Sequence, residues 1–193
     1  QRALNNFRLS TLTLPRDFLK ALGLIKWAAA QANREIAGLD PRVAEAISTA
    51  ALEVSDGRHD AEFPVDVFQT GSGTSTNMNA NEVIATLASR RCGLAVHPND
   101  HVNMSQSSND VIPSTIHLAA SLGVAERLMP ALASLRDAIG LRRVEVGHLP
   151  KTGRTHLMDA VPLTLGQELG GWQQQVQNGM DRILACGPRL HRL

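Results

Sequence analysis

The feature that most constrains the fold of this chain is a run of aliphatic residues at helical spacing downstream of Pro113. These residues recur mostly at intervals of three or four positions: Ile116, Ala119, Ala120, Val124, Leu128, Leu132 and Leu135. Such spacing places apolar side chains along one face of an α-helix. We therefore expect a long helix from about Asn109 to the neighbourhood of Ile139, with that face buried.

The composition also favours helices. Hydrophobic residues make up 43% of the chain, but aromatic residues only 3%, and there is no Tyr. A core filled by Leu, Ala, Ile and Val suits close-packed helices better than a β-sandwich or barrel, whose strands would be richer in aromatic and β-branched residues. The predicted fold class is all-α.

Capping residues and prolines predict four further helices. Residues 15–38 and 40–57 are expected to form an antiparallel helix pair, because Gly38 is placed as a left-handed end-cap and Asp40 as an N-cap before a proline. A helix is expected over Asn81–Arg91 and a last one from Pro162 onward, with residues 1–14 as an extended arm. The face that the first helix is expected to bury consists of Phe18, Leu22, Ile25, Ala29, Ala32 and Ile36.

The helical period disappears between Arg58 and Thr76, where residues 62–68 are expected to adopt strand geometry briefly. The segment ends in a Gly-rich run in which Gly71 and Gly73 permit close backbone approach and Ser72 and Thr74 offer hydroxyls. A loop of this length is usually functional. A surface turn of small polar residues is an equally weighted alternative. The spacing of a phosphate-binding P-loop is absent.

A polar loop at residues 96–103 holds His97, Asp100 and His101. These side chains raise the question of a metal, but nothing supplies another ligand at a familiar spacing. A hydrogen-bonded loop or an anion site is the favoured interpretation. No metal is therefore predicted.

The start of the long helix is the clearest candidate site. Ser108 or Asn109 is expected to cap it, with Pro113 in its first turn. A helix N-terminus carries unpaired N–H groups and partial positive charge, so the hypothesis is a cradle for a carboxylate or phosphate. A further polar turn at residues 148–156 places His156 just ahead of the last expected helix, as a candidate titrating group. A histidine in a turn more often has a structural role than a catalytic one.

Charge and cysteine content narrow the class of protein. Lys and Arg number 19 against 18 Asp and Glu, so no nucleic-acid partner is suggested. Cys92 and Cys186 make neither a disulfide framework nor a metal set, which fits a reducing compartment. We expect no signal peptide, no membrane span and a cytoplasmic location, with the mitochondrial matrix as an alternative. The chain begins at Gln1 without Met and ends within a helical pattern, so we expect a piece of a longer protein.

The sequence contains GSGTSTNMNANEV at 71–83, HPND and SQSSND within 97–110, and GRTHLMDAVPLTLGQE at 153–168. Together these motifs resemble class II fumarase, of the fumarase/aspartase superfamily, and the resemblance runs from about Ala3 to the end. Aspartate ammonia-lyases share much of the pattern but commonly carry Thr in place of Ser108. The serine therefore favours the fumarase reading.

The resemblance implies the reversible hydration of fumarate to L-malate, a reaction of the tricarboxylic acid cycle, without a metal or cofactor. It also implies a homotetramer with active sites shared between subunits. The chain would comprise an N-terminal helical lyase domain over residues 1–108 and the first part of a central bundle of long helices over residues 109–193.

The family's functional residues carry over by position. The substrate-binding residues implied are Ser72, Gly73, Thr74, Ser107, Ser108, Asn109 and Thr155, the histidine of proton transfer is His156, and a second, non-catalytic dicarboxylate site matches His97, Pro98, Asn99 and Asp100. In the family, the base that removes the carbon-bound proton is a serine on a later loop.

This chain departs from the family in three places. The signature GSSxMPxKxN of that later loop is absent, so we expect the chain alone to be inactive. Leu94 stands near a position where some relatives carry an arginine for the second site, and His101 replaces an aspartate frequent in the family. Two alternatives remain open: an ammonia-lyase acting on aspartate, and a non-catalytic helical assembly module.

Overall fold

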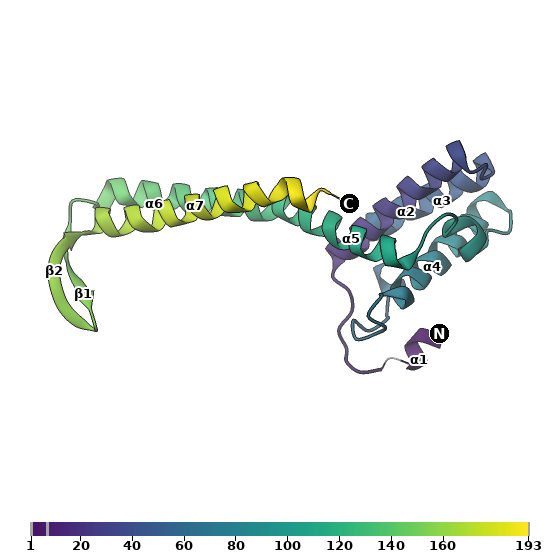
Figure 1. Cartoon of the computed structure of the whole chain (residues 1–193), viewed down its shortest axis with the longest axis horizontal. Coiled ribbons are helices and arrows are strands. Elements are labelled where there is room, and N and C mark those ends of the chain that lie inside the picture. Colours follow the sequence, from purple (N-terminus) through teal and green to yellow (C-terminus); the bar gives the residue numbers. More distant parts are fainter. Residues whose placement is uncertain (1, 7, 193) are drawn as a thin grey trace. The chain divides into compact units, whose positions relative to one another are not determined.

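The computed structural model describes residues 2–6 and 8–192 (Figure 1). The helical elements are α1 (Arg2–Asn6), α2 (Arg16–Ile36), α3 (Pro41–Ser55), η1 (Asp60–Glu62), α4 (Thr74–Cys92), η2 (Pro98–Val102), α5 (Ser108–Gly123), η3 (Val124–Leu128), α6 (Met129–Val146) and α7 (Leu165–Leu190). The strands are β1 (Pro150–Thr155) and β2 (Met158–Thr164). The predicted helical class is confirmed, with one antiparallel hairpin that was not predicted. The chain forms two compact units, residues 1–120 and 121–193.

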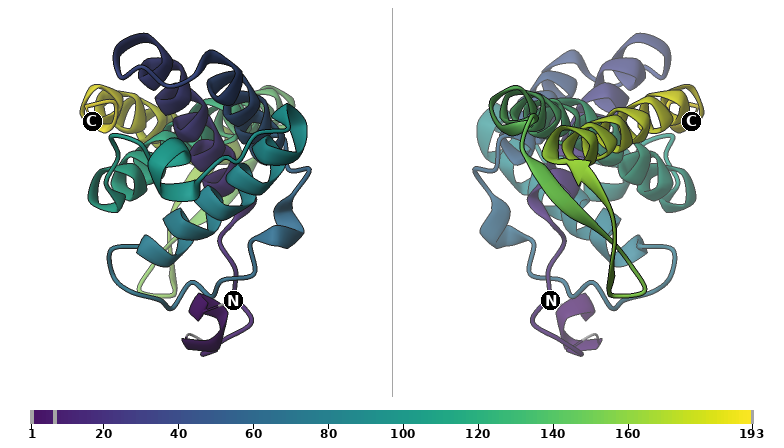
Figure 2. Two further views of the ribbon diagram at one scale, coloured as in Figure 1. Left: turned by 90° about the vertical axis from the view of Figure 1, so that its right-hand side faces the viewer. Right: turned by 90° about the vertical axis from the view of Figure 1, so that its left-hand side faces the viewer.

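The core of the first unit lies between α2, α3 and α4, which pack together (Figure 2). It is built of aliphatic side chains, as the composition predicts: Leu22, Ala44, Ile47, Ala50, Ala51, Ile84 and Ala88 are at most 1% exposed. α2 and α3 approach closely because Gly23 has no side chain. A Cβ at this position would lie 2.7 Å from the Ala51 carbonyl oxygen.

The ends of α2 and α3 confirm the capping signals. Gly38 is left-handed, with φ +71°, and the Leu39 N–H donates to the Asn33 carbonyl at 3.1 Å. Asp40 caps α3, because its carboxylate accepts the Arg42 N–H at 2.8 Å. This hydrogen bond lowers the pKa of Asp40 below its ordinary value.

The buried face of α2 differs from the predicted one. Ala32 is exposed and Ile36 is 84% exposed. In their place Lys26 and Asn33 point inward, because polar partners exist there; the Asn33 amide donates to the Met104 carbonyl at 2.9 Å. A buried polar group that keeps its hydrogen bonds costs little, so it can share a face with aliphatic residues.

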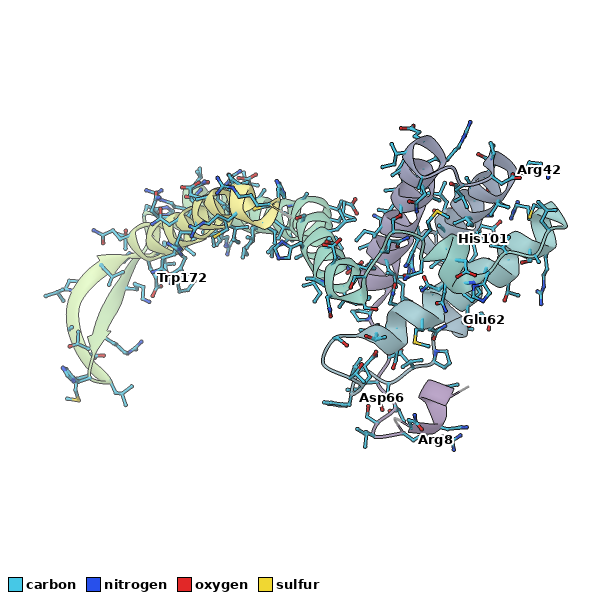
Figure 3. All side chains as sticks on the ribbon, turned by 45° about the vertical axis from the view of Figure 1, so that its right-hand side comes forward. Arg8, Arg42, Glu62, Asp66, His101 and Trp172 are labelled. Carbon is cyan, nitrogen blue, oxygen red and sulfur yellow. The ribbon has the colours of Figure 1, made fainter. Side chains whose placement is uncertain are left out.

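The N-terminal arm is partly helical rather than extended throughout, since α1 occupies Arg2–Asn6; residues 1 and 7 lie outside the described residues. Asp66 holds the arm to the rest of the unit. Its carboxylate accepts the backbone N–H and the hydroxyl of Ser10, and Thr13 bridges to Asp66 as a pair of β-residues (Figure 3). The brief strand geometry expected near residues 62–68 is therefore present at Asp66.

α4 begins at Thr74, earlier than the predicted Asn81. Two local features start it. Gly73 adopts a left-handed conformation with φ +64°, and the Gln69 side-chain oxygen accepts the Thr76 N–H at 3.0 Å. The Gly-rich run therefore leads directly into α4 and is not a flexible linker.

The second unit consists of η3, α6 and α7 with the β1–β2 hairpin between the two long helices, which lie side by side (Figure 1). Pro162 lies within β2, so the prediction that it opens the last helix is wrong. α7 begins at Leu165, where the Thr164 hydroxyl accepts the Gln167 N–H and the Gln167 side chain accepts the Thr164 N–H. This capping box fixes the start.

The long helix runs further than predicted. Ser108–Val146 is continuous over 39 residues, passing the expected end near Ile139. Its predicted buried face is largely exposed in this chain: Ile116 is 53%, Leu128 41% and Leu135 49% exposed. By length and composition alone this helix could cross a membrane, since an 18-residue window within it has a mean hydropathy of 1.2. The expectation that no segment meets those criteria therefore does not hold.

Candidate functional site

Two of the predicted site segments lie together in the first unit, at the starts of α4 and α5. The Asn77 side-chain nitrogen Nδ2 donates to Ser108 Oγ at 3.1 Å. Gly73 faces Ile112, since a Cβ on this glycine would lie 3.0 Å from the Ile112 side chain. The structure therefore brings residues 72–74 and residues 107–109 next to each other.

The first segment presents hydroxyls at a helix entrance. Ser72 is exposed and Thr74 half-buried, and their hydroxyl oxygens lie 2.8 Å apart in a hydrogen bond. Gly73 between them is the residue in the left-handed conformation. The hydroxyls consequently stand at the positive end of α4, a helix of 19 residues.

The second segment is capped by Ser107, not by Ser108 or Asn109 as predicted. The Ser107 carbonyl accepts the Val111 N–H at 2.9 Å and its hydroxyl accepts the Asn109 N–H at 3.3 Å. The cap lies one residue earlier than predicted because Ser108 is already the first residue of α5. Pro113 then falls beyond the first turn, inside the helix, which corrects its predicted position. Ser108 is half-buried and Asn109 exposed.

This arrangement can bind an anion. Two helix N-termini carry partial positive charge, and serine and threonine hydroxyls, an asparagine amide and backbone N–H groups can all donate hydrogen bonds to a carboxylate. The hydrogen bond between Asn77 and Ser108 fixes the two helix entrances relative to each other.

A polar network lies behind these residues, and the sequence reasoning missed it. Asn103 Oδ1 accepts from Lys26 Nζ at 3.1 Å, from Asn77 Nδ2 at 3.1 Å and from Asn81 Nδ2 at 3.2 Å. Lys26 also donates to Gln106 Oε1 at 2.9 Å. The network joins α2, α4 and the loop before α5, so it supports the candidate site from inside.

Lys26 is the most unusual member because its side chain is 0% exposed. Burial disfavours the ammonium form and lowers the pKa of Lys26 from 10.5 to about 7. A signal was readable in the sequence: Lys26 lies four residues after Leu22, on the stripe of α2 that faces the core. Asn77 and Asn81 likewise occupy the buried face of α4. Polar residues at core-facing positions are informative.

The His97–Asp100 segment lies elsewhere in the first unit. The Val96 N–H donates to Ser89 Oγ at 2.9 Å, whereas Ser108 contacts Asn77. Ser89 and Asn77 are separated by about 18 Å along α4 at the rise of an α-helix. The His97–Asp100 segment and the Ser108 segment therefore lie against different parts of α4.

His97 serves as the cap of the short helix η2. Its Nδ1 accepts the N–H groups of Asn99 and Asp100 at 3.3 and 3.2 Å, and Asp100 Oδ2 lies 3.2 Å from the same nitrogen. The His97 N–H in turn donates to His101 Nδ1 at 2.9 Å. Within residues 2–6 and 8–192, no group of three or more His, Cys, Asp or Glu side chains is placed to hold a metal ion.

Thr155 and His156 belong to the second unit, where both are exposed. The prediction that His156 lies just ahead of a helix is wrong. His156 lies with Leu157 in the turn of the β1–β2 hairpin. Both have positive φ, at 48° and 61°. Two consecutive left-handed residues form the mirror-image turn that matches the twist of a hairpin, although Asn and Gly are its usual occupants. Thr155 pairs with Met158 across this turn.

Comparison with known proteins places these features in a family. A family model described as lyase matches residues 1–192. The class II fumarate hydratase of Xylella fastidiosa is 55% identical over 193 residues, 100% of this chain and 41% of that protein. The class II fumarate hydratase of Mycobacterium tuberculosis is 52% identical over 193 residues, 100% of this chain and 40% of that protein.

Solved structures agree. The class II fumarase of Schistosoma mansoni superposes with a TM-score of 0.94 and 40% identity, over 98% of this chain and 41% of that one. The fumarate lyase:delta crystallin of Brucella melitensis gives a TM-score of 0.91 and 40% identity, over 98% and 46%. The chain spans about two-fifths of the curated relatives it matches. Since the family model covers nearly all of its residues, the chain belongs to the lyase family, and its relatives there include class II fumarate hydratases.

Proposed function

We propose that this chain is part of a class II fumarate hydratase, which adds water reversibly to fumarate to give L-malate. The observation that carries the proposal is the pairing of two helix entrances through Asn77 and Ser108, which gathers the donors of residues 72–74 and 107–109. Relatives at 51–55% identity bear this name. The substrate class would be a C4 dicarboxylate, which two clusters of anion-binding donors suit.

The chemistry asks for donors of this kind. Removing a proton from the carbon next to a carboxylate of malate gives an enediolate with extra negative charge on that carboxylate, and the hydroxyl on the neighbouring carbon leaves after it is protonated. A site that binds this intermediate more tightly than malate lowers the barrier. Thr74, Ser107, Ser108 and Asn109 would hold the carboxylates, Thr155 would bind substrate, and His156 would supply the proton to the departing hydroxyl, through a water.

The base that removes the carbon-bound proton is not among these residues. In the family it belongs to a later loop with the signature GSSxMPxKxN, which this sequence lacks. We therefore expect the 193-residue chain alone to form no malate from fumarate. Appreciable turnover by the isolated chain would contradict this expectation.

We also propose assembly into a homotetramer. The support is the apolar surface of the second unit, where large side chains on both long helices are exposed: Leu135, Leu141, Val144, Trp172 and Leu184. Trp172 projects from α7 (Figure 3). Helices with uncovered apolar faces gain free energy by packing against further helices. The cytoplasm is the proposed location.

The second dicarboxylate site remains a proposal for residues 97–100. The His97 nitrogen Nδ1 is already engaged as a cap, whereas the Asn99 side chain is exposed and can meet a ligand. Leu94 supplies no charge there. If the site binds dicarboxylates, a His97→Asn variant of the full-length protein should weaken binding outside the active site and leave fumarate hydration unchanged.

The test of the proposed function uses the full-length protein and follows fumarate by its absorbance. Ser108→Ala and Asn109→Ala should each raise KM about tenfold or more, since each removes a hydrogen bond to a charged ligand. His156→Asn should lower kcat and alter its pH profile. Ser114→Ala is a control, because that serine lies on the same helix outside the site segments.

Three outcomes would contradict the proposal. Ammonia release from aspartate with no malate chemistry would identify an ammonia-lyase. A well-folded, assembled protein without activity on either substrate would favour the helical assembly module. Unchanged rate and pH profile in His156→Asn would remove that residue from the mechanism.

A further inference from the structure

The hydrogen bonds of the buried network behind the candidate site have a defined donor-to-acceptor direction, and Lys26 is the first donor. Lys26 Nζ carries at least two hydrogens in both its ammonium and its neutral form, so it can donate two hydrogen bonds in either form. Its two acceptors are Asn103 Oδ1 at 3.1 Å and Gln106 Oε1 at 2.9 Å. The Asn103 nitrogen donates to the Gln106 backbone carbonyl at 3.2 Å, and a carbonyl can only accept, so the Asn103 amide presents its oxygen to Lys26.

The orientation of Asn103 sets the orientation of Asn77. Because Asn103 Oδ1 faces α4, Asn77 must meet it with an N–H group, and Asn77 Nδ2 lies 3.1 Å away. Turning the Asn77 amide over would place two oxygens against each other at that distance, with no hydrogen between them. Asn81 meets the same oxygen in the same way at 3.2 Å. Among the described residues, Asn77 Oδ1 and Asn81 Oδ1 are buried and accept no hydrogen bond.

Asn77 Nδ2 has two hydrogens, and each has a defined acceptor. One points to Asn103 Oδ1 and the other to Ser108 Oγ, also at 3.1 Å. The Ser108 oxygen is therefore an acceptor on its inner side. Its hydroxyl hydrogen cannot point toward Asn77 Nδ2, which is itself a donor, and it remains available on the other side.

We propose that Lys26, Asn103 and Asn77 form a relay of fixed hydrogen-bond polarity that holds the Ser108 hydroxyl as a donor toward the substrate carboxylate. The inference rests on the proposed function and deepens the role of Ser108 in it. The relay residues are positioning residues, since they act through Ser108. The relay selects for an acceptor, such as a carboxylate oxygen, over a ligand that presents an N–H group at this point.

Asn77 and Asn81 provide a matched test. Both are 2% exposed, both lie on the same face of α4 and both donate to Asn103 Oδ1, but of the two it is Asn77 that also donates to Ser108 Oγ. Asn77→Asp replaces the donor at Ser108 by a carboxylate, which would draw the hydroxyl hydrogen inward. Asn81→Asp adds the same charge one helical turn away and serves as the control.

The experiment measures KM and kcat for fumarate in the full-length protein, with circular dichroism as the check of folding. Asn77→Asp should raise KM about tenfold more than Asn81→Asp does, with a smaller difference in kcat. In a Ser108→Ala background this difference should vanish, because the hydroxyl that the relay orients is gone. If the carboxylate variants do not fold, Asn77→Ala and Asn81→Ala carry the same comparison without the charge.

The outcomes separate the relay from the proposed function. Equal KM values for the Asn77 and Asn81 variants, in a protein where Ser108→Ala itself raises KM, would overturn the relay alone. Unchanged KM in Ser108→Ala would overturn the role of Ser108 and the relay with it. Lys26→Met should raise KM in the same direction as Asn77→Asp, since it removes a donor to Asn103 Oδ1; an unchanged KM would overturn Lys26 as a member of the relay. A wild-type protein that neither hydrates fumarate nor binds a dicarboxylate by calorimetry would overturn both proposals.

Discussion

At the scale of single residues, Lys26 couples the stability of the first unit to pH. Its pKa is lowered to about 7 by burial, while an unfolded chain would keep it near 10.5. Between these values the unfolded state binds a proton that the folded state does not, so the free energy of unfolding rises with pH, by up to about 1.4 kcal/mol per unit. Below pH 7 both states are protonated and the contribution is constant.

The check is urea unfolding of the 193-residue chain between pH 6.5 and 9, followed by Trp27 fluorescence in a Trp172→Phe background. Trp27 lies on α2, next to Lys26 in sequence. The wild-type free energy of unfolding should gain about 2 kcal/mol relative to Lys26→Met over this range. Parallel pH profiles for the two proteins would show that the lysine is not held in a desolvated site.

Gly73 is the second residue whose identity the structure requires. Gly73→Ala should destabilise the chain by about 2 kcal/mol, because alanine is strained at φ +64° and its Cβ would crowd Ile112 at 3.0 Å. Gly93→Ala is a control for strain alone, since φ is +68° and nothing lies within 4 Å. Gly71→Ala, open and without positive φ, should be neutral. Thermal unfolding that ranks the three otherwise would contradict the close contact between α4 and α5.

These residues also show where the sequence was informative. The motif residues 72–74 and 107–109 can be recognised from the sequence alone, because they match a family pattern. Lys26 was not recognised in this way, since a lysine on a helix normally suggests solvent. Its place four residues after Leu22 was the one signal in the sequence, and the contacts with Asn103 and Gln106 show that the lysine is a buried hydrogen-bond donor.

At the scale of secondary-structure elements, local signals predicted the ends of helices better than their beginnings in polar segments. Gly38 and Asp40 bounded α2 and α3 correctly, because a cap acts within a few residues. The start of α4 depends on Gln69, a side chain outside the helix, and was missed. The β1–β2 hairpin was missed because its turn carries His156 and Leu157, residues that rarely adopt left-handed conformations.

The crossing of α2 over α3 gives a prediction for this scale. A methyl group at Gly23 would lie 2.7 Å from both the Ala51 oxygen and the Ser55 nitrogen, which are backbone atoms and cannot move independently. Gly23→Ala should therefore cost about 1–3 kcal/mol of stability despite the better helix propensity of alanine. Gly171→Ala in α7, with nothing within 4 Å, should be neutral or stabilising. Chemical unfolding of both variants tests this, and equal stabilities would refute the close packing.

At the scale of the whole molecule, the two units differ in how much apolar surface they bury. The hydrophobic cluster belongs to the first unit, whereas Met180 is the buried hydrophobic side chain of the second among the described residues. A pair of helices with so small a core is marginal in water. The aliphatic face that the sequence predicted as buried is therefore largely uncovered within the described residues.

The charged side chains of the long helix distinguish between a membrane and a protein partner as the cover of that face. The 39-residue helix Ser108–Val146 is apolar enough for a bilayer, but it carries Glu126, Arg127, Arg136 and Asp137 along its length. Charged side chains are costly in hydrocarbon and tolerable at the edges of a helix bundle. These charges suit packing against further helices, from the rest of the longer protein or from the other copies proposed above, better than a bilayer. Such packing would also account for the regular spacing of the aliphatic residues along this helix.

If assembly covers the face, the melting temperature of the full-length protein should rise with its concentration, and analytical ultracentrifugation should detect a tetramer. Leu184→Glu should shift it toward smaller species, because a charge would be buried at a position now 59% exposed. Gln175→Glu adds the same charge at an exposed polar position of α7 and should leave the tetramer intact. A monomer at all concentrations, or a protein that sediments with lipid vesicles, would contradict the assembly and leave the aliphatic face to another partner.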